Sequence, residues 1–351
     1  MPVSRLGVVV HEGRPPAVEA AEAVRGWCAE HGIPCTAIDV WRGGRTRQGG
    51  SKEAAAAGHP DVIVTLGGDG TFLRGARIAA KDGARVLGVD LGRVGFLTEV
   101  PVDQVLAALD AVHEDRAGEE ERMTLTLRTS RPLAVPEEVD ALMLRYGRGP
   151  RLPPPERLPG EPGWGVAMDV NALNDVVLEK LSRDRQIAVA VYVAGHLLAS
   201  YSADAAIVAT PTGSTAYSFA AGGPVLSPGV QGLVFTPVAP HMSFNRSVVA
   251  ARDEPVAARI LPHSGQVAVS IDGEVRGVLD PGDWIGVYPS GRPVRLVRLG
   301  GTDFYQRLRE RFRLADAPAT EADGVAPPLF PAPTPEVPAD MAELRLPPPA
   351  P

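Results

Sequence analysis

Three glycines surround one aspartate in Gly67-Gly68-Asp69-Gly70-Thr71, and these residue types are suited to binding a phosphate. Glycines let the backbone turn sharply and bring its N–H groups close to an anion, and a helix that begins at Thr71 would point its positive end at the same place. A tight turn alone needs no aspartate between glycines. Asp69 can accept the proton of an attacking hydroxyl and help to bind a divalent cation. The segment therefore predicts phosphorylation of a hydroxyl group.

Hydroxyl side chains are concentrated in a second segment, Thr210-Pro211-Thr212-Gly213-Ser214-Thr215-Ala216-Tyr217-Ser218, at the exit of an expected strand. The hydroxyls supply short polar groups, and the ring of Tyr217 offers a surface on which a base can stack. By composition alone, a helix cap rich in serine and threonine is an equal alternative.

The elements that position the first segment alternate between strand and helix. Apolar runs predict strands over 6–10, 35–40, 61–66 and 85–91, and amphipathic patterns predict helices over 17–30, 71–80 and 103–114. This alternation predicts an α/β domain whose parallel sheet is covered on both faces. Ligands bind such sheets at the carboxyl ends of the strands, which is where Gly67 to Thr71 lies.

From about Met123 the chain consists of short β-rich runs, which predict a second, β-rich domain. The expected strands cover 123–129, 174–180, 186–193, 197–201, 205–209, 256–261, 266–271, 284–288 and 294–299. Phe304, Leu308 and Phe312 have the spacing of one helical face, with arginines on the other, and predict a closing helix. We therefore expect an α/β domain over 1–120, a β-rich domain over 121–300 and the closing helix over 301–314.

Two stretches rich in proline are not expected to fold. Tyr146 to Gly163 is interpreted as a loop inserted in the β-rich domain, and residues 315–351 as a disordered acidic tail. Both are interpreted as peripheral, although a tail of this kind can also dock a partner through residues such as Leu329 and Phe330.

The overall composition excludes several classes of function. A net charge of −7 argues against binding to nucleic acid or to an anionic membrane, which requires clustered lysine and arginine. There is no long apolar run and no signal sequence, so we expect a cytoplasmic protein. The spacing of Cys28 and Cys35 indicates neither a disulfide framework nor a zinc site, and the scattered histidines show no ligand spacing, so no metal-binding residues are predicted.

Four segments resemble, in order and spacing, the successive motifs of the NAD kinase family: Gly67 to Thr71, Gly88 to Leu97, Asn174-Asp175 and Thr210 to Tyr217. The resemblance extends to about Leu314 and omits the two proline-rich stretches. The glycine motif is shared with diacylglycerol-type lipid kinases and, in close form, with phosphofructokinases, whereas the last segment is specific. The resemblance implies a Rossmann-like N-terminal domain, a β-rich C-terminal domain and an active site between them.

The resemblance also implies roles for individual residues. Asp69 resembles the catalytic aspartate that contacts the acceptor 2′-hydroxyl, and its neighbours in the loop would serve the donor phosphates: Gly67, Gly68, Gly70 and Thr71. Asn174 and Asp175 resemble a pair that contacts the dinucleotide, and Asp204 resembles an aspartate that binds a base or ribose. Four residues resemble the wall of the adenine site: Thr212, Thr215, Ala216 and Tyr217. His241 and Asp272-Gly273 resemble further family positions, although Asp272-Gly273 is interpreted first as a hairpin turn.

The chain departs from the usual family pattern at three positions. Asp90 stands for an asparagine, Asp175 for a glutamate, and Ala203-Asp204-Ala205 for Gly-Asp-Gly. Asp175 keeps the charge but reaches one methylene less far, so that a direct hydrogen bond becomes water-mediated. Asp90 adds negative charge near a polyanion and is expected to weaken its binding unless a cation lies between them.

The sequence thus predicts an NAD kinase that uses ATP or polyphosphate as donor, with Mg²⁺ or another divalent cation, to phosphorylate the adenosine-ribose 2′-hydroxyl. The resemblance suggests a homodimer or homotetramer. Two alternatives remain: a kinase of the same fold for another hydroxyl, in a lipid, sugar or nucleoside, and a non-catalytic dinucleotide-binding protein.

Overall fold

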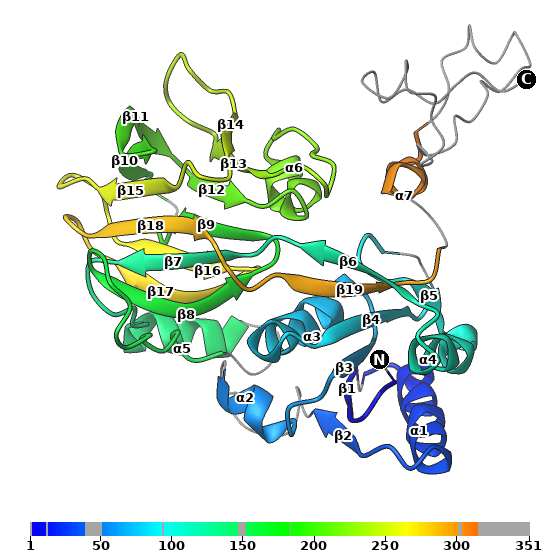
Figure 1. Cartoon of the computed structure of the whole chain (residues 1–351). Helices are drawn as coiled ribbons and strands as arrows, with labels where there is room; N and C mark the ends of the chain where they lie inside the picture. Colours follow the sequence, from blue (N-terminus) through cyan, green and yellow to red (C-terminus); the bar gives the residue numbers. More distant parts are fainter. Residues whose placement is uncertain are drawn as a thin grey trace, which may run out of the picture. The chain divides into compact units, whose positions relative to one another are not determined.

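The computed structural model describes residues 2–11, 13–38, 51–92, 95–146, 152–182, 184–300 and 304–314 (Figure 1). The chain divides into two units, Met1–Arg307 and Leu308–Pro351, and everything discussed below except the end of the last helix lies in the first. Several predictions lie outside the described residues: the tail over 315–351, the start of the closing helix at 301–303, the end of the second strand at 39–40, Arg93 and Val94 of the second motif, and residues 147–151 of the proline-rich loop.

A seven-stranded sheet forms the centre of the N-terminal half, in the order β2-β1-β3-β4-β19-β6 with β5 added to β4. Its strands are β1 (Leu6–Val10), β2 (Cys35–Ile38), β3 (Val62–Leu66), β4 (Arg85–Asp90), β5 (Val100–Pro101), β6 (Gly118–Arg122) and β19 (Val294–Arg298). All five residues of β3 are buried, as expected of a parallel strand covered on both faces. The predicted α/β architecture is confirmed.

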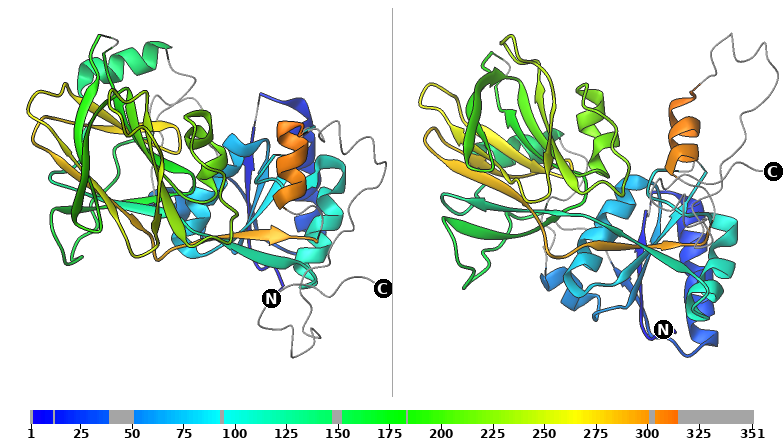
Figure 2. Two further views of the ribbon diagram at one scale, coloured as in Figure 1. Left: turned by 90° about the horizontal axis from the view of Figure 1, so that it is seen from above. Right: turned by 45° about the horizontal axis from the view of Figure 1, so that its top comes forward.

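Helices cover both faces of this sheet (Figure 2). On one face α1 (Pro15–Glu30), the short η1 (Val102–Gln104) and α4 (Val105–His113) pack on β1 and β3 through a core that includes Val24, Leu109 and Val64. On the other face α2 (Ser51–Ala56) and α3 (Asp69–Asp82) pack through a core that includes Phe72 and Ile63. The helix α3, which follows the predicted phosphate loop, is therefore anchored to the sheet along its length.

The strand β19 belongs to the first sheet, whereas the sequence had grouped it with the β-rich half. It runs parallel to β4, with Arg295 opposite Arg85, and antiparallel to β6. Apolar periodicity identifies a strand but not its partner, which explains the wrong grouping. The glutamate-rich β6 was not predicted because its charges obscure the pattern, and ion pairs such as Arg298–Glu120 at 2.6 Å join it to β19.

Two antiparallel six-stranded sheets form the β-rich half. One has the order β11-β10-β15-β18-β7-β8 and the other β14-β13-β12-β9-β16-β17. Side chains from both, among them Leu127, Val189, Val208 and Phe235, share one core, so the sheets pack face to face. The strands are β7 (Leu125–Thr129), β8 (Val166–Ala172), β9 (Asp175–Lys180), β10 (Ile187–Val193), β11 (His196–Ala203), β12 (Ala205–Ala209), β13 (Gly232–Val238), β14 (Val248–Ala251), β15 (Val256–Ile260), β16 (Val267–Ile271), β17 (Glu274–Leu279) and β18 (Trp284–Pro289).

The remaining helices are α5 (Glu137–Tyr146), η2 (Gly213–Thr215), α6 (Tyr217–Ala220) and the closing helix α7 (Phe304–Phe312). The proline-rich segment after α5 was interpreted as peripheral, but Leu152 is 2% exposed and Arg157 bridges to Met168 of β8. The start of its described part, residues 152–155, is therefore packed against the molecule, whereas residues 159–163 are exposed. No helix among the described residues is both long and apolar enough to cross a membrane.

Candidate functional site

The predicted phosphate loop lies between β3 and α3. The helix begins at Asp69, two residues earlier than expected, and Gly68 caps it with extended backbone while its carbonyl accepts the N–H groups of Thr71 and Phe72 at 2.9 and 3.0 Å. A Cβ at Gly67 would lie 2.6 Å from the Cβ of Thr71, so only glycine fits there. A Cβ at Gly68 or Gly70 would meet nothing within 4 Å, which leaves space above the helix end for an anion.

Asp69 is the first residue of α3, and the loop after β4 holds its carboxylate. The N–H of Leu97 donates to Asp69 Oδ1 at 3.2 Å. The same carboxylate lies against Gly95, where a Cβ would come within 2.8 Å of Asp69 Cγ. Asp69 is therefore positioned by the second of the four motifs, Gly88 to Leu97.

Asp90 has an internal role in that motif. It is 5% exposed, and its carboxylate accepts the N–H of Gly92 at 2.9 Å and the hydroxyl of Thr98 at 3.3 Å. The Thr98 hydroxyl in turn accepts the N–H of Gly95 at 2.9 Å. The carboxylate of Asp90, whose charge was expected to weaken phosphate binding, thus holds the loop that contains Gly95.

A second group of predicted residues lines a cavity of about 290 Å³ at the start of β9. The structure brings four of them together there: Asn174, Asp175, Ala216 and Tyr217. The other lining residues are Val177, Glu179, Ser270, Asp272 and Gly273. We call this the β9 cavity. It is concave, with a few polar groups at its wall, as small-molecule sites are.

Asp272 contributes more to this cavity than its sequence context suggested. Its carboxylate accepts the backbone N–H groups of Leu173, Asn174 and Asp175 at 3.0, 2.7 and 3.2 Å. Asp272 and Gly273 have φ values of 48° and 79°, as a two-residue hairpin turn requires. The hairpin interpretation is therefore correct, and the same turn fixes the backbone of the Asn174-Asp175 motif.

Burial changes the acidity of the carboxyls in the β9 cavity. Asp175 is 4% exposed, and burial, followed by the nearby charges of Asp272 and Glu179, raises its pKa to about 7. Burial also raises the pKa of Asp272, opposed by the three N–H groups that it accepts. A carboxyl that titrates near neutral pH therefore faces the cavity.

The hydroxyl-rich segment is tied to the Asn174 motif by hydrogen bonds. Thr210 Oγ1 donates to the carbonyl of Leu173 at 2.6 Å and accepts the N–H of Gly213 at 3.0 Å. A Cβ at Gly213 would lie 2.4 Å from the carbonyl carbon of Asn174, so the two segments touch through their backbones. Thr210 and Gly213 thus join two motifs that are far apart in sequence.

The other predicted residues do not line the cavity. Thr212 is 7% exposed and its hydroxyl accepts Arg122 Nη1 at 3.2 Å, while Thr215 donates to the carbonyl of Thr212 at 3.2 Å. Asp204 pairs with Lys180 at 2.7 Å. His241 is exposed and is not among the lining residues.

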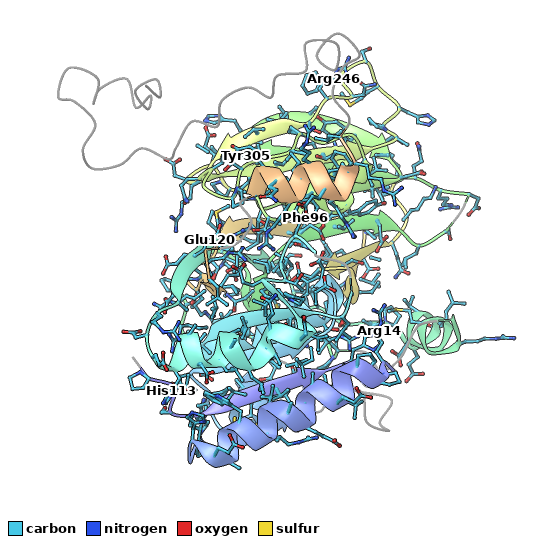
Figure 3. All side chains as sticks on the ribbon, turned by 90° about the vertical axis from the view of Figure 1, so that its right-hand side faces the viewer. Arg14, Phe96, His113, Glu120, Arg246 and Tyr305 are labelled. Atoms are coloured by element: carbon cyan, nitrogen blue, oxygen red, sulfur yellow. The ribbon has the colours of Figure 1, made fainter. Side chains whose placement is uncertain are left out.

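One further feature was not predicted: a chain of ion pairs that reaches Thr212 through a hydrogen bond from Arg122. Glu120, labelled in Figure 3, pairs with Arg122 at 2.9 Å and with Arg298 at 2.6 Å. Arg298 and Arg307 both pair with Glu99, at 2.7 and 2.8 Å, and Arg307 also donates to the carbonyl of Thr98. This chain joins Arg307 and the loop that holds Asp69 to the hydroxyl-rich segment.

No group of three or more histidine, cysteine or acidic side chains that could hold a metal occurs in the part of the chain that the structure describes. Cys28 is buried and Cys35 half-buried, both as free thiols.

The chain is similar in sequence to known family models and relatives, and similar in fold to solved structures. Residues 6–117 match the family model for the ATP-NAD kinase N-terminal domain, and residues 173–299 match that for the ATP-NAD kinase C-terminal domain. NAD kinase 1 of Streptomyces avermitilis is 66% identical over 351 residues, 99% of this chain and 98% of the relative. NAD kinase 1 of Streptomyces coelicolor is 65% identical over 350 residues, 99% of this chain and 96% of the relative.

Two solved structures share the fold. The yeast NADH kinase complexed with NADH has a TM-score of 0.68 at 20% identity, over 90% of this chain and 89% of the yeast chain. An NAD kinase from Archaeoglobus fulgidus in complex with ATP has a TM-score of 0.60 at 22% identity, over 88% of this chain and 97% of the other.

Proposed function

Because this chain belongs to the ATP-NAD kinase family and is therefore an enzyme that phosphorylates NAD to NADP, we propose that Asp69 is its catalytic residue. Asp69 would contact the 2′-hydroxyl of the adenosine ribose and accept its proton as the oxygen attacks the terminal phosphate of the donor. The observation that carries this proposal is the position of Asp69, in the first turn of α3 with its carboxylate fixed by Leu97. Of the three functions inferred from the sequence, the relatives favour the NAD kinase.

The donor phosphates are proposed to bind at Gly67, Gly68, Gly70 and Thr71, where the start of α3 favours negative charge. ATP is the donor that the family description suggests, and polyphosphate has the same chemistry at the transferred group. A divalent cation would neutralise charge that develops on the transferred phosphate. The carboxylate of Asp69 is an oxygen ligand of the kind that Mg²⁺ prefers, so the loop fits such an ion.

The dinucleotide is proposed to bind in the β9 cavity. Asn174 and Asp175 present an amide and a carboxyl group to accept the hydroxyls of a ribose, and the 42% exposed ring of Tyr217 is available to stack on a base. Thr212 and Thr215 would act by holding this wall in place, since their hydroxyls are used within the protein. Asp204 would act from the rim, through its pair with Lys180.

We further propose that the enzyme is a homodimer or homotetramer in the cytoplasm. Large apolar side chains are exposed on and near β11 and β14, at Leu197, Leu198, Phe244 and Val249. Exposed apolar groups of this kind are typical of surfaces that contact another protein. Light scattering on the purified chain, and cell fractionation, test the two statements.

A coupled assay for NADP formation tests the whole proposal. With NAD, Mg²⁺ and either ATP or polyphosphate, the purified chain should form NADP, and removal of the cation with a chelator should stop the reaction. A negligible rate with NAD together with a fast rate on another alcohol would contradict it.

A further inference from the structure

A second cavity, of about 170 Å³, lies along one face of α3. Gly70, Arg74, Arg77 and Lys81 follow one another along that face, with the spacing of successive helical turns. The opposite wall consists of Leu152, Asp169, Val170, Asn171, Ile271, Asp272, Glu274 and Arg276, and Leu73 completes the lining. We call this the α3 cavity. It touches the predicted phosphate loop through Gly70 and the β9 cavity through Asp272, which lines both.

Arg276 is the distinctive residue of the α3 cavity. It is 5% exposed, and among the described residues its one hydrogen bond runs from Nε to the carbonyl of Pro153 at 2.8 Å. Within the described ranges, no acceptor pairs with its two terminal nitrogens and no carboxylate oxygen lies within ion-pair distance. Burial lowers its pKa to about 10. A buried cation without a paired anion destabilises a protein unless a ligand supplies that anion.

Two of the three carboxylates around this cavity have identified partners. Asp169 pairs with Lys81 and, at 3.2 Å, with Arg292, and Asp272 accepts three backbone N–H groups. Glu274, the third lining carboxylate, is not within ion-pair distance of Arg276. None of the three is paired with Arg276 at hydrogen-bond distance; the charges of Glu274, Glu53 and Asp272 act on it from farther away and favour its charged form.

Arg77 adds a second incompletely paired guanidinium. It reaches Glu53 through Nη2 at 3.2 Å, while its buried Nε has no partner among the described residues. The lining holds four cationic side chains, Arg74, Arg77, Lys81 and Arg276, against three carboxylates. Two guanidinium groups with unused donors suit the oxygens of an anion such as phosphate.

We propose that the α3 cavity binds a phosphate group beside the phosphate loop, at a site that Arg276 and Arg77 form. Its volume equals that of about six water molecules in the liquid, enough for one phosphate. The phosphate could belong to the distal end of a polyphosphate donor that extends past Gly70, or to a separate phosphate compound. Both sources share the same chemistry, and Arg276 recognises it in either case.

The test is calorimetric titration of inorganic phosphate into the full-length chain. Arg276→Gln should weaken the binding of phosphate by about tenfold or more, because a hydrogen bond to a charged group contributes about 1.5–3 kcal/mol and 1.4 kcal/mol is a factor of ten. Arg252→Gln, which removes an exposed arginine bonded to Gln231, is the matched control and should bind like the parent. Asp69→Asn should also bind phosphate here, so failure of the catalytic proposal and failure of this one are distinguishable.

Two further measurements keep the test decisive. Phosphate should raise the melting temperature of the parent and not that of Arg276→Gln, and Arg276→Lys should restore part of the effect if the glutamine variant folds poorly.

Arg276→Gln should raise the KM for long polyphosphate but not for ATP if the donor is the source. If the source is a separate compound, phosphate should change the rate of the parent at saturating ATP and leave the variant unaffected. Absence of phosphate binding by the parent in the millimolar range, or equal binding by Arg276→Gln, would overturn the proposal.

Discussion

The carboxylate of Asp69 lies against the Cα of Gly95, close enough that no side chain fits at residue 95. A Cβ there would come within 2.8 Å of Asp69 Cγ and closer still to Oδ1. The neighbouring N–H of Leu97 donates to the same carboxylate. The loop after β4 therefore determines where the proposed catalytic group stands.

Replacing Gly95 with alanine should displace Asp69 and reduce kcat by about 10²-fold or more, since a shift of about 1 Å at a reacting group has an effect of that size. The KM for NAD should change much less. Steady-state kinetics of NADP formation measures both. Gly26→Ala in α1 is a matched control, because a Cβ there meets nothing within 4 Å. It should leave kcat unchanged and stabilise the helix by roughly 0.5–1 kcal/mol. A Gly95→Ala enzyme with the parental kcat would show that the contact does not position Asp69.

The raised pKa of Asp175 predicts a dependence on pH. Its pKa is about 7 in the folded protein against a reference value of 3.8, so the folded state holds a proton that the unfolded state releases between these values. Stability contributed by this group is therefore lost as pH rises through that window, by up to several kcal/mol at about 1.4 kcal/mol per unit. Asp175→Asn should be more stable than the parent at pH 8 and close to it at pH 4.

The same ionisation should affect binding. If ribose hydroxyls donate to Asp175, the KM for NAD should fall as pH rises through about 7 in the parent. In Asp175→Asn that dependence should disappear. Urea unfolding and initial rates at a series of pH values check both statements, and parallel pH profiles for the two proteins would refute this role of Asp175.

The hydrogen bond from Arg122 to Thr212 should support the dinucleotide site. Arg122→Gln removes it and should raise the KM for NAD by about tenfold, the effect of a charge-assisted hydrogen bond of about 1.5 kcal/mol. Thr212→Val should have a similar effect. The double variant should be no worse than either single one, because the two side chains share one interaction. Additive effects on KM would indicate that they act independently.

The buried pair Glu99–Arg307 should stabilise the fold more than it affects chemistry. The two side chains are 2% and 5% exposed, and Glu99 also accepts the N–H of Leu299 at 2.9 Å. Arg307→Met leaves a buried carboxylate with fewer partners and should cost about 3–5 kcal/mol in the free energy of unfolding. Lys52→Gln, which breaks the exposed pair with Glu156, is the control and should cost about 0–1 kcal/mol. Equal losses in the two variants would contradict the ranking by burial.

Much of the fold could be predicted because local patterns determine it. The apolar runs of β1, β3 and β4 and the glycines around Asp69 identify a parallel strand, a turn and a helix start without reference to the rest of the chain. The identity of a strand's partner is not local, and for this reason β19 was grouped with the wrong sheet. The helices α2 and α5 were missed because each borders a segment whose glycines or prolines dominate the composition.

Individual residues of the candidate site could be predicted only where they belong to a recognisable sequence motif. Asn174, Asp175, Ala216 and Tyr217 line one cavity, whereas the hydroxyls of Thr212 and Thr215 form hydrogen bonds elsewhere within the protein. Asp90 was expected to oppose phosphate, and only the structure shows its carboxylate engaged by Gly92 and Thr98. Arg276 gave no signal at all, because an unpaired buried charge is a property of the tertiary structure and not of the sequence around it.

The most direct test of the account is the rate of NADP formation by Asp69→Asn. The amide preserves shape but cannot accept the proton, so kcat should fall by about 10²–10⁴-fold, the usual contribution of a general base, while NAD still binds. Asp82→Asn, at the other end of α3 and paired with His59, is the control and should keep the parental kcat. A parental kcat in Asp69→Asn would contradict the central claim that Asp69 carries the reaction.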